Sequence, residues 1–64
     1  MSTTMKTNRD AVLAVLDDTP RTTDEIAVAA SVPKMQAQFA LTVLAQEGRV
    51  NSQFKKGILT WIAR

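Results

Sequence analysis

Apolar positions recur along this chain with two different periods, and the change of period marks a change of secondary structure. Before residue 48 they recur at helical spacing, and after it they alternate with polar residues. The longest helical segment is residues 33–47. Its inward stripe consists of Ala37, Ala40, Leu41, Leu44 and Ala45. Pro33 suits the first turn of a helix and Gly48 suits the left-handed residue that follows one, so the pattern predicts a helix over residues 33–47.

An earlier helix is predicted over residues 8–17, because the apolar side chains there also follow helical spacing. Thr7 and Asp10 stand in the arrangement of a capping box at its start. Residues 1–6 are polar and show no periodicity. We therefore expect a disordered N-terminal arm over residues 1–6 and a folded domain over residues 7–64.

A shorter helix is predicted between these two, over residues 23–30. Thr22 and Glu25 form a capping box at its start, and Pro20 makes the preceding segment an extended link. Residues 31–32 then form a tight turn into the long helix, so two helices follow each other closely.

The alternating segment predicts two strands, residues 49–54 and 58–63, joined by the basic turn Lys55-Lys56-Gly57. Both faces of this hairpin are rather apolar, so the pattern leaves the register open. We expect Trp61 to anchor the hairpin on the helices, and the alternative is an exposed indole that stacks on nucleic-acid bases. Three helices followed by a two-stranded wing predict a mainly α fold, the winged helix-turn-helix.

Composition excludes several classes of function. The chain has 64 residues, with no cysteine, no histidine and only two glycines. Disulfides are excluded, and neither a zinc site nor a glycine-rich phosphate loop is expected. Because the carboxylates are scattered and one small domain offers little room for a pocket, we expect no enzymatic activity, cofactor, metal or small-molecule effector.

Membrane insertion is also not expected. No apolar run approaches the ~20 residues that a membrane span needs, and no signal-peptide pattern opens the sequence. We expect a cytoplasmic protein.

Charge is distributed unevenly along the chain, whose net charge is +2. Residues 1–32 contain three basic and five acidic side chains, whereas residues 33–64 contain five basic and one acidic side chain. The half with the long helix and the wing is therefore the basic half, as phosphate binding requires. The alternative interpretation is a mildly uneven solvated surface.

Three short strings carry a family resemblance. They are PRTTDEIA at residues 20–27, VP at residues 32–33 and LTVLAQEGRV at residues 41–50. Together they resemble small prokaryotic winged helix-turn-helix regulators of phages, plasmids and fimbrial operons, in which T-x-x-E-[IL]-A is followed by a turn and by L-x-x-L-x-x-x-G-x-[IV]. The resemblance covers residues 8–63. It implies a nucleoid-associated transcriptional regulator that binds double-stranded DNA sequence-specifically, acting as a dimer or with a protein partner.

The resemblance also implies which residues contact DNA, because helix 33–47 would lie in the major groove and the wing on the backbone. These residues are Thr22, Thr23, Lys34, Met35, Gln36, Gln38, Phe39, Thr42, Lys55 and Lys56. Glutamine amides suit adenine, apolar side chains suit the thymine methyl group, and lysines and threonine hydroxyls suit phosphates.

One apolar stripe departs from the family pattern. Met35, Phe39 and Val43 recur every four residues on the outer side of the long helix, where family members usually carry arginine, serine or lysine at the last two positions. Three interpretations remain open: the arm or wing covers the stripe, DNA methyl groups contact it, or it is a dimer or partner interface. The last gives an alternative function, a winged-helix interaction module that docks a partner protein through these three residues.

Overall fold

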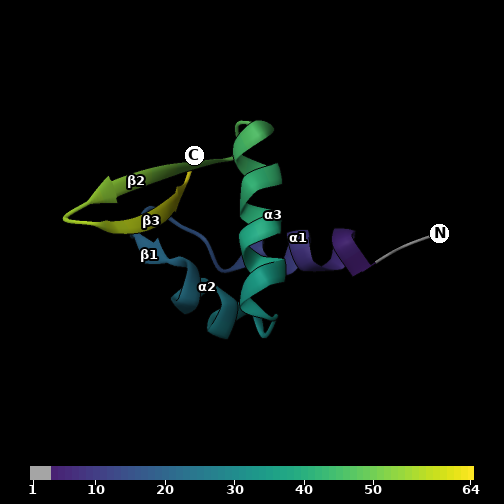
Figure 1. Ribbon diagram of the computed structural model, residues 1–64. Helices are drawn as coiled ribbons and strands as arrows, with labels where there is room; N and C mark the ends of the chain where they lie inside the picture. The colour runs from purple at the N-terminus through teal and green to yellow at the C-terminus, as the bar shows by residue number, and fades with distance from the viewer. Residues whose placement is uncertain (1–3) are drawn as a thin grey trace.

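Three helices and a small antiparallel sheet make up the protein. The computed structural model describes the backbone of residues 4–64 and the side chains of residues 8–64. In chain order the elements are α1 (Thr4–Ala14), β1 (Arg21–Thr22), α2 (Thr23–Ala30), α3 (Lys34–Gln46), β2 (Val50–Lys55) and β3 (Ile58–Ala63). The sheet extends from one side of the helices as a wing, and α1 passes behind α3 (Figure 1). The predicted winged helix-turn-helix fold is thus confirmed. None of the described helices is long and apolar enough to cross a membrane.

The first helix differs most from its prediction. It begins at Thr4 and ends at Ala14, so Thr7 lies inside the helix and does not cap it. The last three residues of the expected arm are helical, and residues 1–3 lie outside the described residues. After Ala14 the amide of Leu16 donates to the carbonyl of Leu13 at 3.2 Å, which tightens the last turn. The acidic residues that follow oppose the helix dipole, which explains why the helix ends early.

The second helix has the predicted bounds, and its capping box is formed. The Glu25 amide donates to the Thr22 hydroxyl at 3.2 Å, and the Thr22 amide donates to the Glu25 carboxylate at 2.9 Å. The helix ends where Ser31 adopts a left-handed conformation with φ 57°. The Val32 amide then donates to the Ala27 carbonyl at 3.0 Å and completes a Schellman turn that redirects the chain into α3.

The third helix matches its prediction to within one residue at each end. Pro33 is the N-cap rather than the first helical residue, with φ −60° and ψ 148°. At the other end Gly48 has φ 77°, and the Arg49 amide donates to the Leu44 carbonyl at 2.9 Å. Ala45 is exposed, so the predicted inward stripe is one residue too wide.

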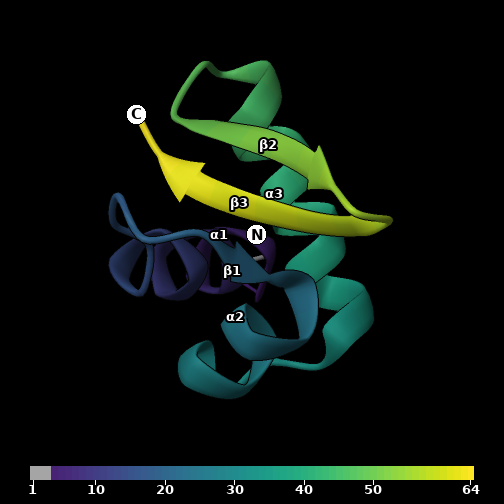
Figure 2. The same ribbon diagram turned by 90° about the vertical axis from the view of Figure 1, so that its left-hand side faces the viewer.

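The sheet contains a third strand that the sequence pattern did not predict. The strand order of the sheet is β1-β3-β2. Trp61 of β3 lies opposite Arg21 of β1 on one side and opposite Ser52 of β2 on the other. Figure 2 looks onto the sheet, with β3 in the middle and α3 behind it. The hairpin turn has only two residues, Lys56 and Gly57, with φ 54° and 78°. Positive φ at both positions indicates a type I′ turn, so Lys55 belongs to β2 rather than to the turn.

The core lies between the three helices and the near face of the sheet. Its buried residues are Val12, Leu16, Ile26, Ala27, Ala37, Ala40, Leu41, Leu44, Val50 and Trp61. Trp61 is 5% exposed, and its indole Nε1 donates to the Thr23 hydroxyl at 2.9 Å. Trp61 is therefore the predicted anchor, and the alternative of an exposed stacking indole is wrong.

Replacing Trp61 with alanine should unfold most of the protein. The lost burial and the cavity together cost about 3–5 kcal/mol, which is comparable to the roughly 3–5 kcal/mol of stability expected from a core of this size. Circular dichroism melting measures the effect. Trp61→Phe is the control: it keeps most of the buried area and should stay folded with a lower melting temperature. An alanine variant that melts like the parent would contradict the anchoring role.

Candidate nucleic-acid interface

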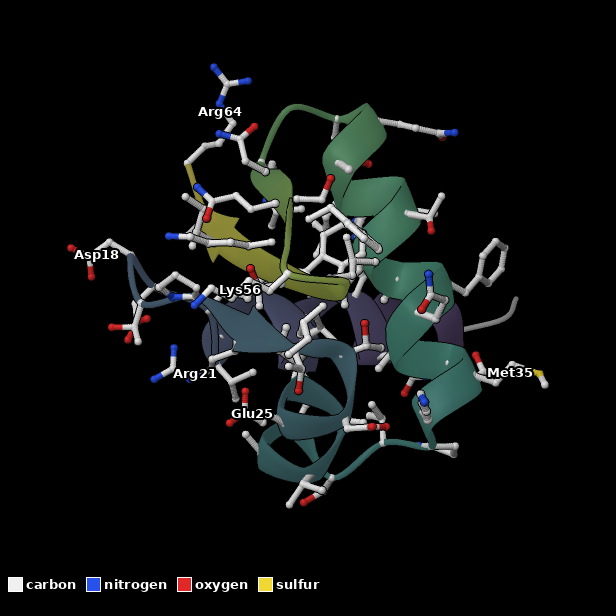
Figure 3. The ribbon with its side chains drawn as sticks, turned by 60° about the vertical axis from the view of Figure 1, so that its left-hand side comes forward. Asp18, Arg21, Glu25, Met35, Lys56 and Arg64 are labelled. Carbon is white, nitrogen blue, oxygen red and sulfur yellow. The ribbon has the colours of Figure 1, made fainter. Side chains whose placement is uncertain are left out.

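The side of α3 turned away from the core is uncovered by the described residues. We call it the outer face, and it consists of Met35, Gln38, Phe39, Thr42 and Gln46, all exposed. Met35 is 80% exposed and Phe39 is 52% exposed. Figure 3 shows Met35 pointing away from the body of the protein. None of the five side chains carries a charge.

Two residues expected on this side lie elsewhere. The Gln36 side chain turns toward α1, where its Oε1 accepts a hydrogen bond from the Asn8 amide group at 3.4 Å. Gln36 is half-buried, and in this arrangement its amide faces α1 rather than the outer side of α3. Val43 is also half-buried, so the exposed part of the apolar stripe is confined to Met35 and Phe39.

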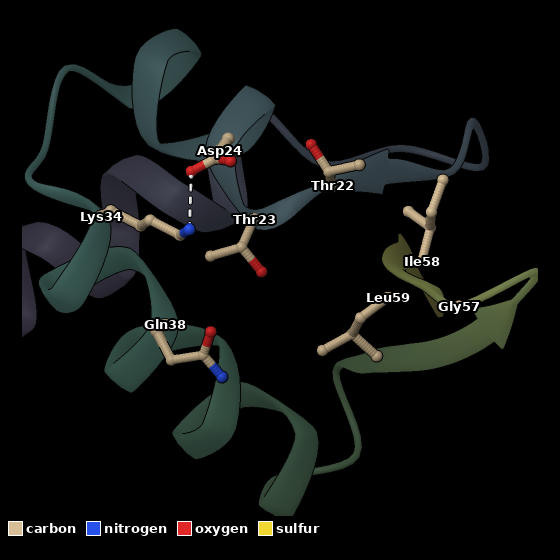
Figure 4. A pocket seen from close by; sticks show the side chains of 8 residues that line it. All are labelled: Thr22, Thr23, Asp24, Lys34, Gln38, Gly57, Ile58 and Leu59. Carbon is tan, nitrogen blue, oxygen red and sulfur yellow. Dashed lines mark ion pairs between the residues drawn. The ribbon is translucent and has the colours of Figure 1, made fainter.

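Lys34, at the start of α3, has an acidic partner. Its Nζ lies 3.1 Å from the Asp24 carboxylate in the first turn of α2, and both side chains are mostly exposed (Figure 4). The pair leaves the start of α3 without net charge. Sequence reasoning missed Asp24, because no periodicity indicates a contact between two separate helices.

A shallow depression lies between the start of α2, the first half of α3 and the tip of the wing. It is lined by Thr22, Thr23, Asp24, Lys34, Gln38, Gly57, Ile58 and Leu59. Figure 4 shows Gln38 facing β3 across this depression. The wing therefore stands beside the outer face of α3 rather than on the far side of the protein.

Both threonine hydroxyls expected to contact phosphate accept hydrogen bonds within the fold. Thr23 is 7% exposed, and its hydroxyl accepts the bond from Trp61. The Thr22 hydroxyl accepts from the Glu25 amide. Asp24 and Glu25 also supply negative charge to the first turn of α2, where a phosphate would otherwise bind. Thr22 and Thr23 thus both have structural contacts, and their contacts with phosphate stay a prediction.

The tip of the wing is basic and apolar. Lys55 and Lys56 are exposed, and neither forms an ion pair with the described residues. Lys56 lies at the turn (Figure 3), with Phe54 and Ile58 exposed beside it. The tip of the wing thus carries two positive charges that pair with no described carboxylate.

Two arginines among the described residues are held by the protein's own carboxylates. Arg9 of α1 lies 2.9 Å from Glu47 at the end of α3. The Arg21 guanidinium donates to the Asp17 carboxylate, which lowers the pKa of Asp17 and raises the pKa of Arg21. Of the two carboxylates in these pairs, Asp17 belongs to the acidic half and Glu47 to the basic half. Within residues 4–64 no group of side chains is suited to hold a metal ion.

The fold is that of a small winged helix-turn-helix protein, built from α2, α3, the tight turn between them and the adjoining wing. The described residues leave the outer face of α3 uncovered. The chain belongs to the FaeA-like protein family, whose model matches residues 8–63. This family consists of small regulator-like proteins associated with fimbrial operons, which agrees with the resemblance found in the sequence. No curated protein and no solved structure matches the chain.

Lys56→Asn should stabilise the wing while it removes one of the two lysine charges at the tip. A left-handed conformation costs an ordinary side chain about 1–2 kcal/mol, and asparagine tolerates it better. We expect a melting temperature a few degrees higher, measured by circular dichroism. Lys55→Asn is the matched control, because it removes the same charge from an extended position in β2 where asparagine is disfavoured. Equal melting temperatures for the two variants would contradict the type I′ turn.

Proposed function

We propose that this protein is a sequence-specific transcriptional regulator that binds double-stranded DNA, with α3 in the major groove and the wing on the backbone. The observation that carries the proposal is the uncovered outer face of α3 beside a wing tip with two unpaired lysines. Membership of a family of small regulator-like proteins supports it.

The chemistry of each side chain decides whether it would contact a base or a phosphate. Gln38 presents an amide that suits adenine, whereas Lys55 and Lys56 present ammonium groups that suit phosphate. The proposed role is therefore binding rather than catalysis. Few side chains reach base edges from one copy, so useful specificity requires two copies or a partner protein on adjacent sites.

Titration of a random-sequence duplex at several salt concentrations tests the proposal first. Each neutralised phosphate contributes about 0.9 to the slope of log affinity against log salt concentration. A slope of about 2 or more supports DNA binding. Absence of duplex binding at low salt would overturn it.

The wing should account for most of that slope. Lys55→Gln combined with Lys56→Asn should weaken binding to all sequences alike and lower the slope by up to about 2. The matched control is Arg49→Gln with Arg64→Gln, which removes the same net charge at the opposite end of the hairpin (Figure 3). An equal fall in slope for both double variants would show a general charge effect rather than a wing contact.

The second candidate is a module that docks a partner protein, and the exposure of Met35 and Phe39 favours it. The substitution Phe39→Lys distinguishes DNA binding from the docking of a partner protein. If the outer face binds a protein or a second copy, the unpaired lysine should dissociate the complex in sedimentation, because burying it is costly. If the face binds DNA, the same lysine should raise affinity for random duplex and alter the preferred sequence. An unfolded variant would contradict both.

A further inference from the structure

We propose that the outer face of α3 recognises A·T base pairs, chiefly through the methyl group of thymine. This inference rests on the proposed function, since it names the class of sequence that the same surface reads.

The outer face lacks the chemistry that reads guanine. Guanine presents two acceptors in the major groove, and arginine or lysine is the usual donor to them. The outer face contains neither residue. Lys34 is the only cation on α3, and Asp24 holds it at 3.1 Å on the side that faces α2. G·C pairs would therefore meet no matching charged donor on this surface.

Apolar groups dominate what the face does present. Met35 and Phe39 are 80% and 52% exposed. The Thr42 hydroxyl donates its proton to the Gln38 carbonyl at 2.9 Å, and its methyl group adds to the apolar surface of the face. The thymine methyl is the apolar group on base edges in the major groove, and contact between it and these side chains removes both from water.

Gln38 supplies the complementary polar group. It is exposed on the wing side of the outer face, and its amide has the donor and acceptor that match adenine N7 and N6. Gln36, which has the same chemistry, is turned to Asn8. Two amides and three apolar groups on one helix face thus suit adenine and thymine rather than guanine and cytosine.

The size of the patch and the charges beside it favour DNA over a protein partner. A stable protein interface needs about 800 Å² on each side, contributed by roughly 20–30 residues. Only two large apolar side chains are exposed on α3. The nearby wing lysines, without ion pairs among the described residues, complement a polyanion.

Selection of bound sequences from a pool of random duplexes, followed by uracil substitution, tests the inference. Replacing thymine by uracil removes only the C5 methyl group. We expect selected sites with an A·T-rich core. Uracil in that core should weaken binding about fourfold for each methyl in contact, or about fifteenfold for two, with an unchanged salt slope.

Protein variants test whether side chains of α3 cause the preference for thymine over uracil. The double variant Met35→Ala with Phe39→Ala should bind thymine and uracil duplexes equally, because it has lost the side chains that meet the methyl groups. Val28→Ala is the matched control: it truncates an apolar side chain that is 80% exposed on α2, outside the outer face, and should keep the full preference for thymine. The comparison of thymine and uracil duplexes with the parent protein needs no variant. It therefore tests the inference even if a substitution disturbs folding.

Each contrary outcome has a distinct meaning. Equal affinity of the parent protein for thymine and uracil duplexes, or selection of G·C-rich sites, would overturn this inference and leave DNA binding intact. Absence of any salt-dependent duplex binding would overturn the proposed function and this inference together.

Discussion

A buried hydrogen bond from the Trp61 indole to the Thr23 hydroxyl joins the sheet of this small protein to its helices. Trp61 lies in the middle strand of the sheet, and Thr23 is the first residue of α2. A chain of this length buries little apolar surface, so one large aromatic side chain supplies much of the contact between sheet and helices. The neighbouring residue Thr22 caps α2 and pairs with Thr60 of β3, which fixes the same junction through the backbone. The position of the wing beside α3 depends on this junction.

Local signals predicted most of the fold. The capping box at Thr22 and Glu25 gave the start of α2, and Gly48 gave the end of α3, because both signals depend on residues adjacent in sequence. The errors occurred where a tertiary contact decides the outcome. Strand β1 has two residues, too few for any periodicity, and it exists because β3 pairs with it. Thr7 resembled a cap, yet α1 begins at Thr4.

The candidate site was less predictable than the fold, for a related reason. A helical wheel separates the core side of α3 from the other side, and it placed Met35, Gln38 and Phe39 correctly in the exposed sector. The wheel contains no information about neighbouring elements. It therefore missed that Asn8 draws Gln36 toward α1 and that Asp24 reaches Lys34 from α2. Exposure follows from one helix alone, whereas hydrogen-bond partners depend on how the helices cross.

The ion pair between Lys34 and Asp24 has a consequence for how a regulator of this kind would find its site. A free lysine at the start of a DNA-binding helix strengthens binding to every sequence alike, whereas contacts with base edges strengthen binding to one. Because a genome offers an enormous excess of unrelated sequence, the useful quantity is the ratio of the two affinities. If α3 binds DNA as proposed, the pairing of Lys34 with Asp24 within the fold would raise that ratio. A cell would then need fewer copies of the protein to keep a single operator occupied.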